Sequence, residues 1–108
     1  MNHQLDLSSH SLQVTIPGDI LSSNAAALRE DLFQLLGTPG IRNGDWTLLR
    51  LDLSRAKMID SVGLNLLVAL VRDMKAQNRK LQAVIASPNI HRTFQFTRLD
   101  QQIQVVLR

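Results

Sequence analysis

Residues 51–64 place the strongest constraint on the fold of this chain, because they join an apolar strand to an apolar helix through an Asp-Ser turn. Leucines alternate with polar residues before the turn, which predicts a strand with one buried face over residues 46–53. After the turn, apolar residues recur at helical spacing from Ser61 to about residue 78. Ser61 is therefore expected at the mouth of a helix, where unpaired backbone N–H groups and the helix dipole would accommodate a phosphate.

The rest of the chain alternates between short strands and helices. Polar residues recur at every second position of the predicted strands, which favours helices mainly on one face of the sheet. Helices that link consecutive strands require parallel pairing and right-handed crossovers, so we expect an α/β fold with a mixed four- to five-stranded sheet in the order ββαβαβαβ. The further predicted elements are a hairpin over 4–7 and 12–16, a helix over 24–36 capped by Ser22 or Ser23, a surface loop over 37–45, strands over 81–86 and 103–107, and a helix over 88–98.

The apolar side chains predict one core. On the helix after the turn, the expected buried stripe is Leu64, Leu67, Val68, Val71 and Met74. The aromatic residues Trp46, Phe94 and Phe96 are expected to pack in or near the same core. A chain of 108 residues has the size of a single domain, so residues 1–108 are assigned to one.

The composition excludes several classes of site. Without cysteine, neither a disulfide framework nor a thiolate metal site is possible, and His3, His10 and His91 have no metal-ligand spacing, so we expect no metal and no cofactor. The longest apolar run, residues 66–71, is too short to span a bilayer, and no targeting segment is recognised. We therefore expect a cytoplasmic protein without membrane insertion.

Charge is distributed unevenly along the chain. Residues 1–54 carry three basic and six acidic side chains, whereas residues 55–98 carry eight basic and two acidic ones. The basic residues Arg72, Lys75, Arg79 and Lys80 have the spacing of the solvated face of the helix that follows Ser61, and no aromatic residues interleave with them for base stacking, so no nucleic-acid partner is expected. Arg50 and Asp52 lie on the same face of one strand and are interpreted as an ion pair.

No catalytic machinery is evident in the sequence. A serine hydrolase needs a histidine beside its nucleophile, yet no Gly-x-Ser-x-Gly elbow is present and no histidine is placed near Ser61. A Gly-rich phosphate-binding loop is absent too. We therefore expect a binding module and not an enzyme.

Several segments together resemble the STAS domain of bacterial anti-sigma factor antagonists. The main motif runs from Leu51-Asp52-Leu53-Ser54 to Met58-Ile59-Asp60-Ser61-Val62-Gly63-Leu64 and the helix beyond. Pro17-Gly18-Asp19-Ile20 is similar to the family's strand-to-helix turn, and Ala86-Ser87-Pro88-Asn89-Ile90, with Arg92 and Phe94, is similar to its last helix. The resemblance covers nearly the whole chain.

The resemblance implies an anti-anti-sigma factor that works by partner switching. Its unphosphorylated form would bind an anti-sigma factor serine kinase and release a sigma factor; phosphorylation at Ser61 would inactivate it, and a serine phosphatase would restore it. Asp60 is implied to orient the serine, and Gly63 to let the backbone of the partner approach. The implied partner-binding residues are Asp19, Ile20, Leu21, Ser22, Asp60, Ser61, Val62, Gly63 and Leu64.

Two departures from the family pattern leave alternatives open. Many members carry Ser or Thr at the position of Val62, and the antagonists of the family tend to be acidic, whereas the second half of this chain is basic. STAS-like proteins also attach to the ATPase subunit of ABC-type lipid transporters, which is the alternative function that these departures favour. A STAS module of another signalling scaffold is a third possibility.

Overall fold

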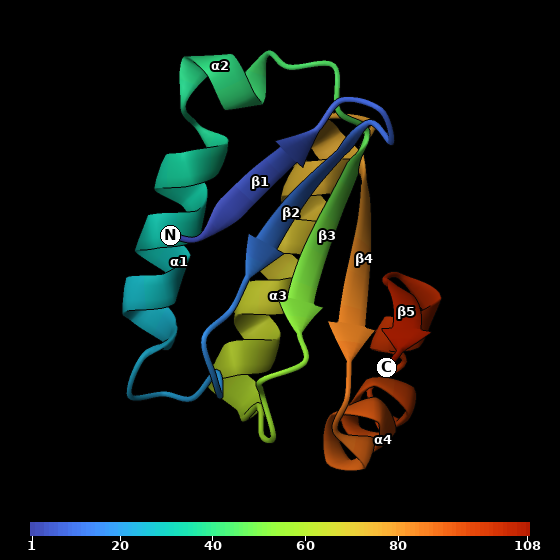
Figure 1. Cartoon of the computed structure of the whole chain (residues 1–108). Helices are drawn as coiled ribbons and strands as arrows, with labels where there is room; N and C mark the ends of the chain where they lie inside the picture. The colour runs from blue at the N-terminus through green and yellow to red at the C-terminus, as the bar shows by residue number, and fades with distance from the viewer.

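The computed structural model describes residues 1–108 and contains one five-stranded sheet with helices against one face, as Figure 1 shows. The strands lie in the order β1-β2-β3-β4-β5; β1 and β2 are antiparallel, and the other neighbours are parallel. The elements are β1 (His3–Asp6), β2 (Ser11–Thr15), α1 (Ala25–Leu36), α2 (Pro39–Arg42), β3 (Leu48–Leu53), α3 (Ser61–Ala76), β4 (Lys80–Ile85), α4 (Pro88–Phe96), the 3-10 helix η1 (Leu99–Gln101) and β5 (Gln104–Leu107). The predicted mixed α/β sheet and its element order are confirmed.

The two faces of the sheet differ in chemistry. Leu12, Leu49 and Leu81 are paired neighbours and are buried beneath the helices. One residue along each strand, the opposite face carries Arg50 beside Gln82, and the Arg50 Nε donates to the Gln82 Oε1 at 2.6 Å. The expected ion pair between Arg50 and its strand neighbour Asp52 does not form, because Gln82 already takes the guanidinium.

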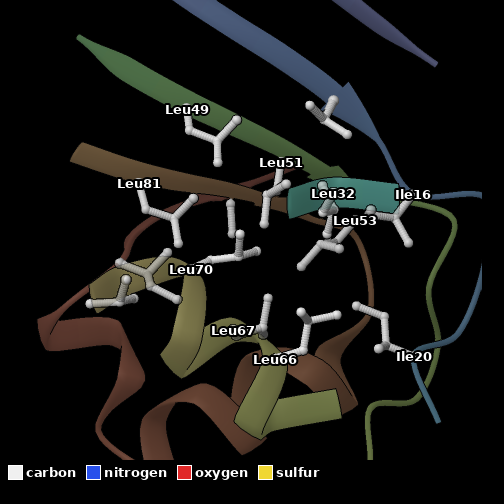
Figure 2. Close-up of a cluster of buried hydrophobic side chains, with 14 of the residues drawn as sticks. Ile16, Ile20, Leu32, Leu49, Leu51, Leu53, Leu66, Leu67, Leu70 and Leu81 are labelled. Atoms are coloured by element: carbon white, nitrogen blue, oxygen red, sulfur yellow. The ribbon is translucent and has the colours of Figure 1, made fainter. Parts of the chain in front are cut away.

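The long helix α3 packs its apolar side chains under the middle of the sheet (Figure 2). Its buried residues are Gly63, Leu66, Leu67, Leu70, Val71 and Met74, whereas Leu64 and Val68, which were expected on this stripe, are only half-buried. The error has a simple cause: residues 66–71 are all apolar, so spacing alone does not define the buried side. At 16 residues α3 is the longest helix, and no helix here is long and apolar enough to cross a membrane.

The aromatic residues divide between core and surface. Trp46 and Phe94 are 2% and 0% exposed, as predicted, but the prediction for Phe96 is wrong because its side chain is 92% exposed. Phe94 and Ile90 are one helical turn apart and point into the core together. Phe96 lies two residues beyond Phe94, about 200° around the helix, and so faces outward.

The predicted loop over 37–45 contains the short helix α2, which corrects that prediction. Pro39 stands at the first helical position, where its fixed φ favours a helix and its missing N–H is not needed. The carbonyls at the end of this segment find partners elsewhere in the chain: the Trp46 Nε1 donates to the Ile41 carbonyl at 2.6 Å. A contact of this kind depends on the rotamer of Trp46, which the sequence pattern does not reveal.

Arg79 holds this segment against the end of α3. Its Nε donates to the Trp46 carbonyl at 2.9 Å, and one terminal nitrogen donates to the Arg42 and Gly44 carbonyls at 3.0 and 2.7 Å. The guanidinium also stacks over the Trp46 ring, 3.6 Å from its centroid. Burial, followed by the neighbouring charge of Arg42, lowers the pKa of Arg79. One side chain therefore donates to three backbone carbonyls between residues 42 and 46.

We expect Arg79→Ala to lower the free energy of unfolding by about 2–3 kcal/mol, because several carbonyls lose a charged donor and Trp46 loses its stacking partner. Urea titration followed by Trp46 fluorescence measures the effect, and the native-state emission of Trp46 should change as well. Arg72→Ala is the matched control, since Arg72 is an exposed residue of α3 whose side chain makes no hydrogen bond. Equal stability of the two variants would contradict this role for Arg79.

Candidate functional site

The candidate site is the turn between Ile59 and Ser61, where two loops meet at one end of the sheet. The loops that follow β2 and β3 run side by side there (Figure 1) and form a parallel bridge between Ile20 and Ile59. The Ile20 N–H donates to the Met58 carbonyl at 3.2 Å, and the Asp60 N–H donates to the Ile20 carbonyl at 3.2 Å. The beginning of α3 is thus fixed against the loop that leads to α1.

Asp60 is the N-cap of α3, and its carboxylate joins the first turn of α3 to the loop that follows β2. Its Oδ1 accepts from the Gly63 N–H at 2.9 Å, and its Oδ2 accepts from the Ser22 N–H at 2.7 Å. These bonds, that from Gly63 first, lower the pKa of Asp60, so the carboxylate is charged at neutral pH. The hydrogen bonds do not show the implied role of orienting Ser61, because both oxygens accept from backbone N–H groups and neither accepts from the Ser61 hydroxyl. Asp60 instead fixes the shape of the turn and supplies a negative charge beside the serine.

A second carboxylate secures the same pair of loops. The Asp19 Oδ1 accepts from the N–H groups of Lys57 and Met58 at 2.7 and 3.2 Å. Asn24 completes the arrangement: its Oδ1 accepts from the Leu21 N–H at 2.8 Å, and its Nδ2 donates to the Asp19 carbonyl at 2.8 Å. Asn24, and not Ser22 or Ser23, occupies the N-cap position of α1. Asn24 was not among the predicted caps, although Asn is a common N-cap residue.

Ser61 is the first residue of α3, is exposed, and its hydroxyl makes no hydrogen bond. Two apolar side chains flank it in the sequence: Met58 is 52% exposed and Val62 is 44% exposed. A serine that served only as a structural cap would normally use its hydroxyl on a nearby backbone group. Here Asp60 does the capping, so the hydroxyl of Ser61 is left accessible beside an apolar patch.

Gly63 serves the packing of the chain itself. A Cβ at this position would lie 2.4 Å from the Ile20 carbonyl oxygen and 2.7 Å from the Cγ2 of Ile59. The space that was expected to admit the backbone of a partner is therefore filled by the neighbouring loop. Only close contact between the loop and the first turn of α3 explains why glycine is needed here.

The nine predicted partner-binding residues lie together at this turn, but they differ in accessibility. Ser22, Ser61 and Val62 are exposed; Asp19, Leu21, Asp60 and Leu64 are half-buried; Ile20 and Gly63 are buried. The side chain of Ile20, 1% exposed, belongs to the core and offers no surface to a partner. No three His, Asp or Glu side chains converge anywhere in the structure into a group that could hold a metal ion.

The last helix borders this site. Ser87, the N-cap of α4, and Asn89 donate side-chain hydrogen bonds to the Lys57 carbonyl at 3.3 and 3.4 Å. Because Lys57 also donates its N–H to Asp19, the beginning of α4 is connected to the loop that carries Asp60. The site end of the molecule thus includes three loops and the first turns of two helices.

Solved structures with this arrangement include anti-sigma factor antagonists. A putative antagonist from Thermotoga maritima superimposes with a TM-score of 0.82 at 16% identity, covering 99% of this chain and 85% of that one. The unphosphorylated form of SpoIIAA has a TM-score of 0.70 at 18% identity, with 97% and 88% coverage. The phosphorylated form of SpoIIAA from Bacillus has a TM-score of 0.63 at 19% identity, with 97% and 91% coverage. At these identities the likeness establishes the fold.

Family membership rests on the sequence itself. The family model described as "Mlab, STAS domain" matches residues 3–108, which is almost the entire chain. The segments that resembled this family, including the Asp60–Ser61 turn, all fall within the match. This protein belongs to the STAS domain family.

Proposed function

We propose that this protein is an anti-anti-sigma factor. Its unphosphorylated form binds an anti-sigma factor kinase through the surface around Ser61 and thereby frees a sigma factor, and phosphorylation of Ser61 ends the interaction. The observation that carries the proposal is the free, exposed hydroxyl of Ser61 at the first position of α3, next to the exposed apolar side chains of Met58 and Val62. Similarity to antagonists, one of them solved in a phosphorylated form, supports it.

The chemistry of the turn suits a charge switch. A phosphate adds a charge of about −1.5 to −2 at pH 7. The first turn of α3 tolerates an anion because of its dipole, yet Asp60 is already charged beside it. A partner that covers Met58 and Val62 would have to bury this added charge, which is unfavourable without a new cation. Phosphorylation would therefore weaken binding while the fold persists.

A second candidate function uses the same surface without a switch. As an accessory subunit of an ABC-type lipid transporter, the protein would dock on the ATPase subunit through the turn. The exposed Val62, at a position where many antagonists carry a hydroxyl, favours a permanent apolar contact of this kind. The excess of basic residues over 55–98 is consistent with it too.

Affinity capture of the tagged full chain from its own cells, followed by labelling with radioactive ATP, distinguishes the two functions. We expect capture of an ATP-dependent kinase that labels the wild type and the control Ser23→Ala, an exposed serine near the turn, but leaves Ser61→Ala unlabelled. Labelling of Ser61→Ala at the wild-type level would show that the site is wrong. Capture of an ABC-transporter ATPase in place of a kinase would overturn the sigma-factor proposal.

A further inference from the structure

The outer face of α4 carries an exposed aromatic side chain that the core does not explain. Phe96 is 92% exposed, the highest value among the large apolar residues of the chain, whereas Ile90 and Phe94 on the inner face are 1% and 0% exposed. Single exposed apolar residues are common and need no function. What distinguishes Phe96 is the charge of the surface around it.

That surface is basic and has no acidic counterpart on its own helix. Arg92 lies one turn before Phe96 on the same face of α4, and Arg98 follows two residues after Phe96. Neither guanidinium makes a hydrogen bond or an ion pair, and residues 88–99 contain no Asp or Glu. The nearest acidic residue along the chain, the exposed Asp100, pairs with neither arginine, so both cations are available to the carboxylates of a partner.

The surface is also open. Asn89, Arg92, Thr93, Gln95 and Phe96 border a shallow depression along one side of α4. Aromatic residues and arginine are enriched in the centres of protein interfaces, where a polar rim surrounds them. The depression brings Arg92 and Phe96 together within two helical turns. We refer to its five residues, together with Arg98 in the turn that follows the helix, as the α4 surface.

We propose that the α4 surface docks an acidic segment of a protein partner. An apolar side chain of that segment packs against the Phe96 ring, and its carboxylates pair with Arg92 and Arg98. The surface lies at the same end of the molecule as the start of α3 (Figure 1), and Asn89 is hydrogen-bonded to the loop that leads to Ser61. This interaction does not require Ser61 to be unmodified, so it goes beyond the proposed function.

A lipid surface is a poorer occupant. Helices that lie on membranes present a long apolar face and many cations on the polar side. The helix α4 has nine residues, and only one large apolar side chain on its outer face is exposed. Two arginines and one phenylalanine match a short acidic segment of a protein better than an extended membrane interface.

Three labelled 12-residue peptides test the proposal with the full chain by fluorescence anisotropy. The first contains glutamates and two leucines, the second replaces each Glu with Gln, and the third replaces each Leu with Ser. We expect the first peptide to bind at least tenfold more tightly than the others. Its affinity should fall as the salt concentration rises. Amide chemical shifts of the protein should change over α4. Equal binding of the Gln peptide, no binding of the first, or shifts elsewhere would overturn the proposal.

Matched variants assign the binding to the surface. Phe96→Ala and Arg92→Gln should each lower the affinity for the first peptide at least tenfold. The melting temperature of each variant should equal that of the wild type. Leu7→Ala, which removes a side chain that is 67% exposed elsewhere, and Arg72→Gln on α3 should bind as wild type. Ser61→Asp should also bind as wild type, which separates this interaction from the switch at the turn. Phe96-dependent binding to phosphatidylglycerol vesicles without peptide binding would assign the surface to lipid and overturn the proposal.

Discussion

Gly63→Ala is expected to destabilise the protein by about 2–3 kcal/mol, although the same change in a helix normally stabilises it by almost 1 kcal/mol. The added Cβ would stand 2.4 Å from the Ile20 carbonyl oxygen and 2.7 Å from a methyl group of Ile59. Backbone oxygen does not move aside as a flexible side chain does. The loop that carries Ile20 would have to separate from α3.

That separation would also break the bonds that shape the turn. The Ile20 carbonyl accepts from the Asp60 N–H, and the Asp60 carboxylate accepts from the Ser22 N–H. Both connect the loop after β2 to the start of α3. We therefore expect Gly63→Ala to weaken partner binding in addition to stability, because the surface around Ser61 loses its support.

Urea unfolding followed by the fluorescence of Trp46, a buried residue far from Gly63 in the sequence, measures the effect. Gly40→Ala is the control, because Gly40 also lies in a helix and its Cβ would meet nothing within 4 Å. That variant should be unchanged or more stable by about 0.4–1 kcal/mol. If Gly63→Ala proved as stable as Gly40→Ala, the close approach of the loop to α3 would be wrong.

The order of strands and helices was predictable because it depends on local patterns. Alternating leucines mark β3, the turn residues Asp60 and Ser61 mark the start of α3, and Ser87 with Pro88 marks the start of α4. Each of these signals lies within a few residues of the element it specifies. The candidate site could be located for the same reason, since it sits at a strand-to-helix junction.

The roles of individual residues at the site were less predictable, because they depend on partners about 40 residues away in the chain. Asp60 binds Ser22, and Asp19 binds the backbone of Lys57. A sequence pattern does not show that the carboxylate of Asp60 is already used by two backbone groups. The internal hydrogen bonds of these carboxylates could therefore be found only from the structure.

The burial of Phe96 and Arg79 was also predicted wrongly from residue type, in opposite senses. Hydrophobicity predicted a buried Phe96, yet helical geometry turns it away from Phe94 and into solvent. Charge predicted a solvated Arg79, yet its guanidinium lies over Trp46 and caps the carbonyls of a distant loop. Residue type indicates an average environment, and only the packing of α3 and α4 decides these two cases.

Ser61→Asp is expected to weaken binding of the partner at least a hundredfold while the melting temperature stays within about 4 °C of wild type. The fold tolerates the charge because position 61 is the first residue of α3, where the helix dipole contributes about 0.3–1 kcal/mol and offsets repulsion from Asp60. The interface does not tolerate it, since an unpaired charge covered by a partner costs several kcal/mol.

Two variants separate charge from size and position in this experiment. Ser61→Asn adds a side chain of the same shape without charge and should lose less than tenfold in affinity. Asn65→Asp adds the same charge one turn further along α3, at an exposed position farther from the turn, and should have a smaller effect than Ser61→Asp. Calorimetry with the captured partner gives the affinities. Because only the charge distinguishes Asp from Asn at position 61, equal losses for these two variants would mean that partner release depends on crowding at the turn and not on an electrostatic switch.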